Sequence, residues 1–518
     1  MSTECLSDRL TAAAHGLGKK KAITFLRKGK IETELSYAEL LDDSNRMAQT
    51  FQRMGISKGD RVILFLPKSL ALVIAHLGLL SIGAISVPLN PGFKKAEMSY
   101  FLADSEARLV LCSREQEPMI REIAPEVPRL LIAPEKPYQE IDFFRAAPAV
   151  RPAVRLGPED PGLIIYTSGT TGNPKGAVLS QRNLVKDAEN IVQIWEITEA
   201  DVLCHALPLF HIHGLCFALH TCLMAGSHIV MLDAFTPGAV IEILAQGQGD
   251  LACTLFMAVP SMYAMLIENV GERRLNFEHL RLWTSGSAPL LPQDFARMKR
   301  IFGKEPLERE GMSETGMNFS NPLRGMRKPG SIGRPLPGVQ VRLVDPETAQ
   351  DVPPGQTGEI WLKSPSITSG YWRKPGETAK AFADGWFKTG DLARVDEDGY
   401  YFLTDRIKHI IISGGENISP QEVEGLINSL AGVIESAVVG IADERWGERV
   451  VAAVVADPGA GLDPQKVRAY CKEHLHDWKC PKEVIMVREL PRNTMGKVLK
   501  DDVKGLFPTP PTLSSADH

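Results

Sequence analysis

Cysteine pairs are missing from this chain of 518 residues. Its eight cysteines are scattered, with no C-x-x-C pair and no histidine at zinc-binding spacing. This excludes a disulfide framework of the secreted type and argues against a zinc site. Isolated thiols are typical of a reducing compartment. The chain also begins without a basic segment followed by an apolar one, so we expect no secretory signal and a cytoplasmic location.

The sequence also lacks long basic blocks and an uninterrupted apolar stretch of the length that spans a membrane. The formal net charge is -5, so the chain lacks the electrostatic footprint of a nucleic-acid-binding protein. The most apolar stretch, 70–89, is broken by Gly83 and Pro88. It therefore predicts a buried helix followed by a short core strand near 84–87, and not a membrane span.

The length and the order of patterns indicate several domains. Helix and strand signals alternate from Ser36 to Pro289, and short strands follow Gly330. The pattern of predicted strands and helices changes again near Asp405. Ser419, with Pro420 and Glu422 after it, predicts the start of a helix in this last part. We therefore predict an α/β protein with a large layered domain that includes a β-rich subdomain (1–404), a hinge (405–408), a small mobile α+β domain (409–504) and a flexible tail (505–518).

Residues 166–176, Y-T-S-G-T-T-G-N-P-K-G, carry the strongest chemical signal. The apolar runs on both sides predict two buried strands joined by a tight loop. Glycines let backbone N–H groups turn inward, hydroxyls add donors, and Lys175 adds a mobile charge, so the loop suits a triphosphate. A P-loop is disfavoured because G-x-x-x-x-G-K-[ST] does not occur. The residues predicted to bind phosphate are Thr167, Ser168, Gly169, Thr170, Thr171, Gly172 and Lys175.

This loop resembles the signature of the adenylate-forming (ANL) superfamily, which includes acyl-CoA synthetases, peptide-synthetase adenylation domains and beetle luciferases. A second segment, 308–315 (E-R-E-G-M-S-E-T), follows at the distance that the superfamily expects. The resemblance implies that Glu314 holds Mg²⁺. Members usually have an aromatic residue where this chain has Glu310, and that departure puts nucleotide affinity in question. The resemblance implies nucleotide contacts from Glu308, Glu310, Gly311, Met312 and Ser313, and from Gly286, Ser287 and Ala288.

Three further positions match the superfamily towards the end of the chain. Asp391 would accept both ribose hydroxyls, and Arg406 would add a donor. Lys408 occupies the hinge position. The run 491–497, P-x-x-T-x-G-K, resembles the loop that carries the catalytic lysine, here Lys497. Such a cation stabilises the negative charge that develops on the α-phosphate, together with His211 and Thr170 in the implied catalytic set.

The resemblance, which spans about 36–499, implies an AMP-forming acyl-CoA synthetase that uses ATP, Mg²⁺ and CoA. A carboxylic acid is first converted to acyl-AMP and pyrophosphate, and rotation about Lys408 then brings in a CoA-binding face. That face is predicted to contain Ser413, Gly414, Gly415, Glu416 and Asn417. The expected partners are small molecules only, and the sequence leaves monomer and homodimer open.

The motifs are most similar to malonyl-CoA synthetases and related acyl-CoA synthetases. In the malonyl enzymes an arginine two places after the tyrosine of V-P-[TS]-M-Y pairs with the distal carboxylate, whereas this chain has Met265. A buried carboxylate without a cation is costly. We therefore expect a short- or medium-chain, alicyclic or aromatic monocarboxylate, with malonate-type acids and a carrier-protein acceptor as alternatives. The predicted acid pocket contains His211, Met257, Val259, Met265, Gly286 and Met312.

Overall fold

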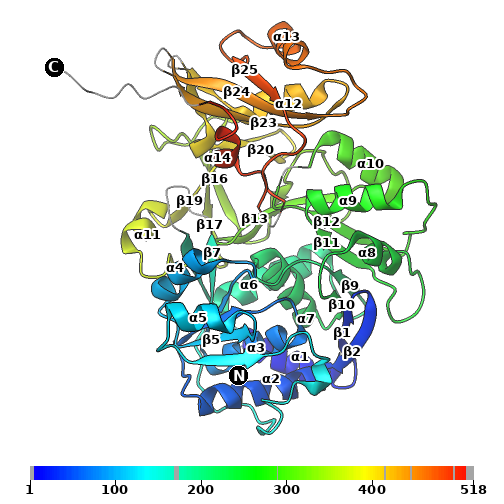
Figure 1. Cartoon of the computed structure of the whole chain (residues 1–518), viewed down its shortest axis with the longest axis vertical. Coiled ribbons are helices and arrows are strands. Elements are labelled where there is room, and N and C mark those ends of the chain that lie inside the picture. Colours follow the sequence, from blue (N-terminus) through cyan, green and yellow to red (C-terminus); the bar gives the residue numbers. More distant parts are fainter. Residues whose placement is uncertain are drawn as a thin grey trace, which may run out of the picture. The chain divides into compact units, whose positions relative to one another are not determined.

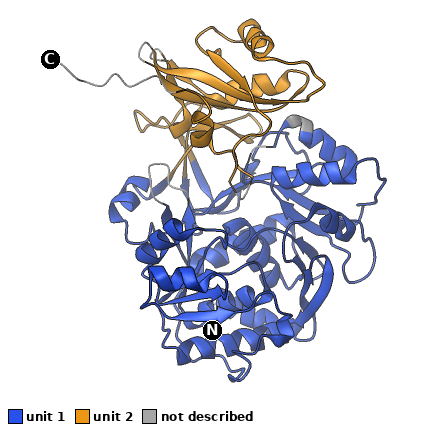
Figure 2. Ribbon diagram, in the orientation of Figure 1, with its two compact units in different colours: residues 1–341, 362–387 blue, residues 342–361, 388–518 orange. Residues whose placement is uncertain are grey.

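The computed structural model describes residues 5–167, 174–288, 290–413, 416–443, 446–493 and 496–508. The chain forms two compact units, one of Met1–Val341 with Leu362–Phe387 and one of Arg342–Trp361 with Lys388–His518 (Figure 2). Both mix helices with sheets, which confirms the predicted α/β class (Figure 1). Among the described residues, no helix combines the length and the apolar character needed to cross a membrane.

The first unit contains a six-stranded sheet in the order β6-β5-β3-β4-β7-β8. All its neighbouring strands run parallel except the pair of β7 and β8. The strands are β3 (Arg61–Phe65), β4 (Ile85–Pro88), β5 (Leu109–Ser113), β6 (Arg129–Ile132), β7 (Pro161–Thr167) and β8 (Lys175–Ser180). The predicted strands around the phosphate loop are therefore confirmed, as an antiparallel pair.

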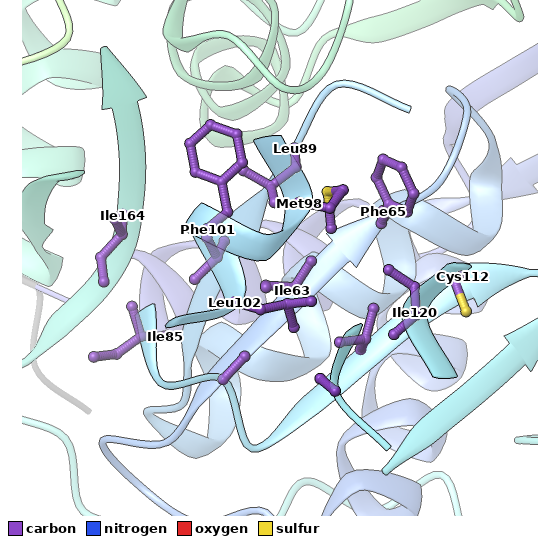
Figure 3. Close-up of a cluster of buried hydrophobic side chains, with 14 of the residues drawn as sticks. Ile63, Phe65, Ile85, Leu89, Met98, Phe101, Leu102, Cys112, Ile120 and Ile164 are labelled. Carbon is purple, nitrogen blue, oxygen red and sulfur yellow. The ribbon is translucent and has the colours of Figure 1, made fainter. Parts of the chain in front are cut away.

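One face of this sheet packs on two helices, α4 (Lys95–Ser105) and α5 (Glu117–Ile123). Figure 3 shows Met98 and Phe101 of α4 against Ile63 and Phe65 of β3. The apolar stretch near 70–89 is the predicted buried helix, α3 (Leu70–Ile82), which ends at Gly83 with a φ of 71° before β4 begins. A left-handed φ at this position is one that glycine adopts without strain.

A nine-stranded sheet forms the other layer of the first unit, in the order β15-β14-β13-β12-β11-β9-β10-β1-β2. The central strands from β1 to β13 run parallel, so the carboxyl ends of β11, β12 and β13 meet at one edge. This is the edge at which open α/β sheets bind ligands. The strands are β1 (Lys21–Arg27), β2 (Lys30–Ser36), β9 (Val202–His205), β10 (His228–Leu232), β11 (Leu255–Ala258), β12 (Leu282–Ser285), β13 (Leu307–Met312), β14 (Gly316–Ser320) and β15 (Arg334–Pro335).

Further helices accompany these strands in the first unit. The helix α2 begins with a capping box, in which Ser36 and Glu39 bond to each other's backbone N–H groups. A π-helical segment, η2, follows β9. The bounds are α1 (Leu6–Leu17), α2 (Tyr37–Arg53), η1 (Tyr138–Glu140), α6 (Gln181–Trp195), η2 (His213–His220), α7 (Thr221–Ala225), α8 (Pro237–Leu244), α9 (Pro260–Val270), α10 (Pro292–Phe302) and α11 (Pro375–Ala381).

The β-rich segment predicted after Gly330 is a five-stranded sheet, within which the chain passes from one compact unit to the other. Its order is β16-β17-β19-β18, with β20 paired to β19. The strands are β16 (Gln340–Val344), β17 (Gly358–Lys363), β18 (Phe382–Ala383), β19 (Trp386–Val395) and β20 (Tyr401–Arg406).

The second unit also holds the sheet of the C-terminal region, in the order β22-β21-β24-β23 with β25 on β24. Alternate residues of β24 face opposite cores: Val450, Ala452 and Val454 pack with α12 and α13, whereas Val451 and Ala453 pack with Val503 of α14. The elements are η3 (Ile407–His409), β21 (Ile411–Ser413), β22 (Glu416–Ile418), α12 (Pro420–Ser429), β23 (Val433–Asp443), β24 (Gly447–Ala456), α13 (Pro464–His474), β25 (Glu483–Met486) and α14 (Lys500–Lys504). The predicted boundary at 404/405 and the hinge stay predictions.

Candidate active site

The strands on both sides of the phosphate loop place two predicted residues, Thr167 at the end of β7 and Lys175 at the start of β8. The Lys175 ammonium forms an ion pair with Glu377 and lies 5.3 Å from the centroid of the Tyr371 ring. Glu377 and Tyr371 are both far from the loop in sequence, and no local pattern pointed to them. The other predicted loop residues lie outside the described residues: Ser168, Gly169, Thr170, Thr171 and Gly172.

Glu314 lies beside this loop, as its predicted magnesium role requires. Glu314 as a residue is 7% exposed. Its Oε1 accepts hydrogen bonds from the Thr167 hydroxyl (3.3 Å) and from the Tyr371 hydroxyl (3.1 Å). Burial and the nearby Glu314 raise the pKa of Tyr371, which keeps this hydroxyl a donor. The described residues contain no cluster of three or more metal-binding side chains. A single carboxylate is still what Mg²⁺ needs when phosphates and waters supply the other ligands.

The strand β13 carries three charged side chains in succession. Glu308 is buried, and its Oε1 accepts a hydrogen bond from the Gly330 N–H at 2.8 Å. Burial raises its pKa to about 8, so it is largely protonated at neutral pH. Glu310 accepts a hydrogen bond from the Asn318 amide at 3.1 Å. The following Gly311, Met312 and Ser313 are half-buried.

Arg309, between these two glutamates, is a residue that the sequence analysis missed. It is 3% exposed, and none of its three guanidinium nitrogens has a hydrogen-bond partner among the residues that the structure describes. The guanidinium lies 5.1 Å from the centroid of the Phe217 ring. Burial lowers its pKa to about 10, which leaves it charged at neutral pH.

The loop after β12 contacts this guanidinium. A Cβ built on Gly286 would lie 2.7 Å from Cζ of Arg309, so only glycine fits there with the arginine in place. Ser287 adopts a φ of 70°, a strained conformation for a serine. Its hydroxyl lies 3.4 Å from Nδ1 of His213 in η2. Ala288, the third predicted residue of this loop, is half-buried.

Two histidines, His211 just before η2 and His213 at its first position, have neutral rings. Burial lowers the pKa of His211 to about 4, and burial with the nearby Arg309 lowers the pKa of His213 well below its usual range. Nε2 of each ring is buried and has no hydrogen-bond partner within the described part of the chain. Neutral imidazoles at this position can donate or accept a hydrogen bond but add no charge.

The predicted acid-pocket residues divide into two groups. Met257 and Val259, at the end of β11, are buried. Met265 is 47% exposed, because the inward face of α9 is formed by Tyr263, Leu266 and Ile267. Helical spacing from Tyr263 could have shown this. The expectation of an apolar acid depended on a buried methionine at position 265. Because Met265 is exposed, it no longer supports that expectation.

In the second unit, Asp391 and Arg406 form a close pair. Asp391 is 5% exposed, and Nε of Arg406 lies 2.6 Å from its Oδ1. Burial raises the pKa of Asp391, and Arg406, Lys497 and Lys408 oppose that shift. Lys497 is exposed, and its ammonium interacts electrostatically with Asp391, Arg406 and Lys408. Burial and repulsion by Arg406 and Lys408 lower the pKa of Lys497 to about 8.

The predicted CoA face is the hairpin of β21 and β22. Ser413 is buried and pairs with Glu416 across the hairpin. Glu416 and Asn417 are exposed. Gly414 and Gly415 lie outside the described residues.

Comparisons with known proteins all indicate the same family. The model of the family described as "AMP-binding enzyme" matches residues 10–372, and that of the "AMP-binding enzyme C-terminal domain" matches 422–497. A sulfoacetate–CoA ligase of Cupriavidus necator is 36% identical, covering 90% of this chain and 91% of its own length. A feruloyl-CoA synthase of an Amycolatopsis species is 35% identical, covering 92% and 94%. The crystal structure of ATP-bound MatB from Rhodopseudomonas palustris superposes with a TM-score of 0.90 at 37% identity, covering 97% and 98%.

Proposed function

The chain belongs to the AMP-binding enzyme family and is an AMP-forming acid–thiol ligase, and on this premise we propose which of its residues act in each half-reaction. The enzyme uses ATP, Mg²⁺ and CoA. In the first half-reaction an oxygen of the acid attacks the α-phosphorus of ATP, and pyrophosphate leaves. In the second, the CoA thiol loses its proton and attacks the acyl carbon, and AMP leaves.

The main support for this assignment of roles is the position of Glu314 beside Thr167, where the predicted phosphate-binding loop begins. Thr167 and Tyr371 both donate to its Oε1, which fixes the carboxylate, and Lys175 is anchored nearby by Glu377. Lys175 would contact the phosphates directly. Glu314 would hold the magnesium ion, which when bound neutralises phosphate charge.

Asp391 and Lys497 would serve the nucleoside and the transferring phosphorus. The Asp391 carboxylate, oriented by Arg406, suits the paired hydroxyls of a ribose. Lys497 supplies a positive charge at the oxygens of the α-phosphate. Its lowered pKa reflects the cations around it, and an approaching phosphate would restore the protonated form.

The second half-reaction would use the hairpin of β21 and β22 as the CoA-binding face, after rotation about Lys408. The rotation and the domain boundaries stay predictions. So do the alternative of transfer to a carrier protein and the cytoplasmic location. The acid also stays open. One relative is named for sulfoacetate and another for a feruloyl product, so the printed names include both an anionic and an aromatic tail.

The test measures AMP and pyrophosphate release from Mg-ATP with a panel of carboxylates, each with and without CoA. AMP formation that depends on both an acid and CoA is the expected result. Pyrophosphate release that does not respond to CoA would favour the carrier-protein alternative. Absence of turnover with every acid would contradict the proposed division of roles.

A further inference from the structure

Lys68 connects the two sheets of the first unit at one residue. It lies just after β3 of the six-stranded sheet, and His205 is the last residue of β9 in the nine-stranded sheet. Nζ of Lys68 lies 2.9 Å from Nδ1 of His205 and 2.8 Å from the backbone oxygen of the same residue. His205 is 1% exposed. The amine therefore fixes both the ring and the backbone at the end of β9.

The ring of His205 passes this contact on to Gly214, whose carbonyl oxygen lies 2.9 Å from Nε2. A carbonyl oxygen only accepts, so Nε2 carries the proton. Burial and the nearby Lys68 lower the pKa of His205 well below its usual range, so the ring is neutral and Nδ1 is an acceptor. Lys68 must then be the donor to Nδ1. Burial lowers the pKa of Lys68 to about 7, but the charged and the neutral amine both have enough N–H groups for its two contacts.

The bond between His205 and Gly214 closes the base of a loop formed by residues 206–213. Gly214 is the second residue of η2, so the chain leaves β9 and returns to its end. A Cβ built on Gly214 would lie 2.1 Å from the carbonyl oxygen of Pro208, so the loop folds tightly on itself and only glycine fits there. Lys68, His205 and Gly214 thus form one chain of hydrogen bonds across the base of the 206–213 loop.

The 206–213 loop carries two histidines of the candidate active site. His211 belongs to the predicted catalytic set and to the predicted acid pocket. Nδ1 of His213 lies 3.4 Å from the hydroxyl of Ser287, which is a long distance for a hydrogen bond. Since this contact is weak, the position of both rings depends on the stronger bonds at the base of the loop.

We propose that Lys68 is a positioning residue that acts through His205 to hold the 206–213 loop, and with it His211, in place for the acid substrate. This rests on the proposed function, in which a carboxylic acid is the first substrate. The carboxylate assigned to magnesium is fixed by other bonds, because Glu314 accepts from Thr167 and Tyr371. Loss of the Lys68 contacts should therefore weaken use of the acid and leave ATP binding nearly unchanged.

The first test is a kinetic comparison of Lys68→Met with the unaltered enzyme. The assay is CoA-dependent AMP formation from Mg-ATP, with malonate, hexanoate and benzoate as the acids. Lys68→Met removes both hydrogen bonds at similar length, so KM for the acid should rise roughly tenfold while KM for ATP changes by less than about twofold. Lys68→Arg keeps donors and should recover part of the loss. If Lys68→Met does not fold, Lys68→Gln, which is shorter and polar, takes its place.

Variants of His205 test whether Lys68 acts through this ring. His205→Gln keeps one acceptor and one donor, so it should stay within about threefold of the unaltered enzyme. His205→Leu removes both and should reproduce the effect of Lys68→Met. The double variant Lys68→Met with His205→Leu should be no worse than either single variant, because the two residues belong to one chain of bonds.

Hydrogen exchange measured by mass spectrometry on the full chain tests the loop without any acid. In Lys68→Met the amides of residues 206–217 should exchange roughly tenfold faster, whereas those of β10 should keep their rates. The matched control is Lys304→Met, which removes an amine that donates to two backbone oxygens, those of Glu278 and Leu280. A second control, His228→Leu, removes a buried histidine from β10, the strand beside β9. Neither control should speed exchange in the loop or raise KM for the acid.

Three results would overturn the proposal. One is an unchanged KM for the acid and unchanged loop exchange in Lys68→Met. Another is an equal rise in KM for the acid and for ATP, with faster exchange throughout the first unit, since Lys68 would then support only the fold. The third is additive losses in the double variant. Absence of turnover with every acid would instead contradict the proposed function, and the exchange experiment would still decide whether Lys68 holds the loop.

Discussion

The hydroxyl of Tyr371 donates a hydrogen bond to Oε1 of Glu314 across 3.1 Å, although 57 positions separate the two residues. Glu314 is 7% exposed, so a lost donor is not readily replaced by bulk water. Tyr371→Phe should lower kcat/KM for acyl-AMP formation about tenfold and raise the magnesium concentration needed for half-maximal rate, because a hydrogen bond to a charged group contributes about 1.5–3 kcal/mol. Pyrophosphate exchange against magnesium concentration measures this. Tyr470→Phe, which removes an exposed hydroxyl bonded to Ser429, is the matched control.

The contact between Gly286 and Arg309 gives a second variant of the candidate active site. In Gly286→Ala the new Cβ would lie 2.7 Å from Cζ of Arg309 and 2.8 Å from Nη1, so the guanidinium must move. We expect a loss of about tenfold or more in kcat/KM for acyl-AMP formation, because Gly286 belongs to the loop predicted to contact the nucleotide and the acid. Gly16→Ala in α1, where a Cβ would meet nothing within 4 Å, should change no kinetic constant. Equal kcat/KM of the Gly286 variant and the unaltered enzyme would rule out this role for the loop.

Local patterns predicted the elements that frame the site. The apolar runs on either side of the phosphate loop are β7 and β8, and the Ser419 hydroxyl accepts from the Glu422 N–H at the start of α12, as its sequence indicated. Such features depend on neighbours within a few residues. The magnesium role of Glu314, which a resemblance implied, stays a prediction, and the hydrogen bond that Glu314 accepts from Thr167 agrees with it.

Side-chain direction and long-range contacts were less predictable. Arg309 lies between two glutamates on β13, a sequence that is typical of an exposed strand, yet it is 3% exposed. Its burial depends on Phe217 and Gly286, which come from other elements. Tyr371 likewise bonds to Glu314, and Glu377 pairs with Lys175, only because the tertiary fold brings these residues together. Met265 was predictable, since helical spacing from the buried Tyr263 places it outward.

The pKa of Lys497 predicts the pH dependence of the first half-reaction. Burial and repulsion by Arg406 and Lys408 lower this pKa to about 8, below the ordinary lysine value of 10.5. The protonated form is the active one in our proposal, so kcat/KM for acyl-AMP formation should fall as pH rises through about 8. Lys408→Gln removes a repelling cation and should move this decline to higher pH. Lys479→Gln, which removes a lysine paired with Glu422, should leave the profile in place. A profile of the unaltered enzyme that is flat up to pH 10 would rule out this role for Lys497.

Glu310 replaces the aromatic residue expected beside the nucleotide base, and its carboxylate accepts a hydrogen bond from Asn318 at 3.1 Å. In Glu310→Tyr a ring could stack on adenine, a contact that contributes about 1–3 kcal/mol for nucleic-acid bases. We expect KM for ATP to fall about three- to tenfold. Steady-state kinetics at saturating acid and CoA measure this, with the exposed Glu473→Tyr on α13 as control. A rise in KM would mean that the carboxylate itself takes part in nucleotide binding.

The buried Glu308 predicts a pH-dependent difference in stability. Burial raises its pKa in the folded state to about 8, above the ordinary glutamate value of 4.5, so between these values the folded chain holds a proton that the unfolded chain has lost. Stability therefore falls as pH rises through this window. Glu308→Gln keeps an acceptor for the Gly330 N–H but has no proton to lose. Its unfolding free energy relative to the unaltered protein should rise by about 1–3 kcal/mol between pH 5 and about 8. Urea unfolding at the two pH values measures this, with the exposed Glu268→Gln as control. An unchanged KM for ATP would assign Glu308 to the fold, whereas a tenfold rise would support the nucleotide contact predicted from the sequence.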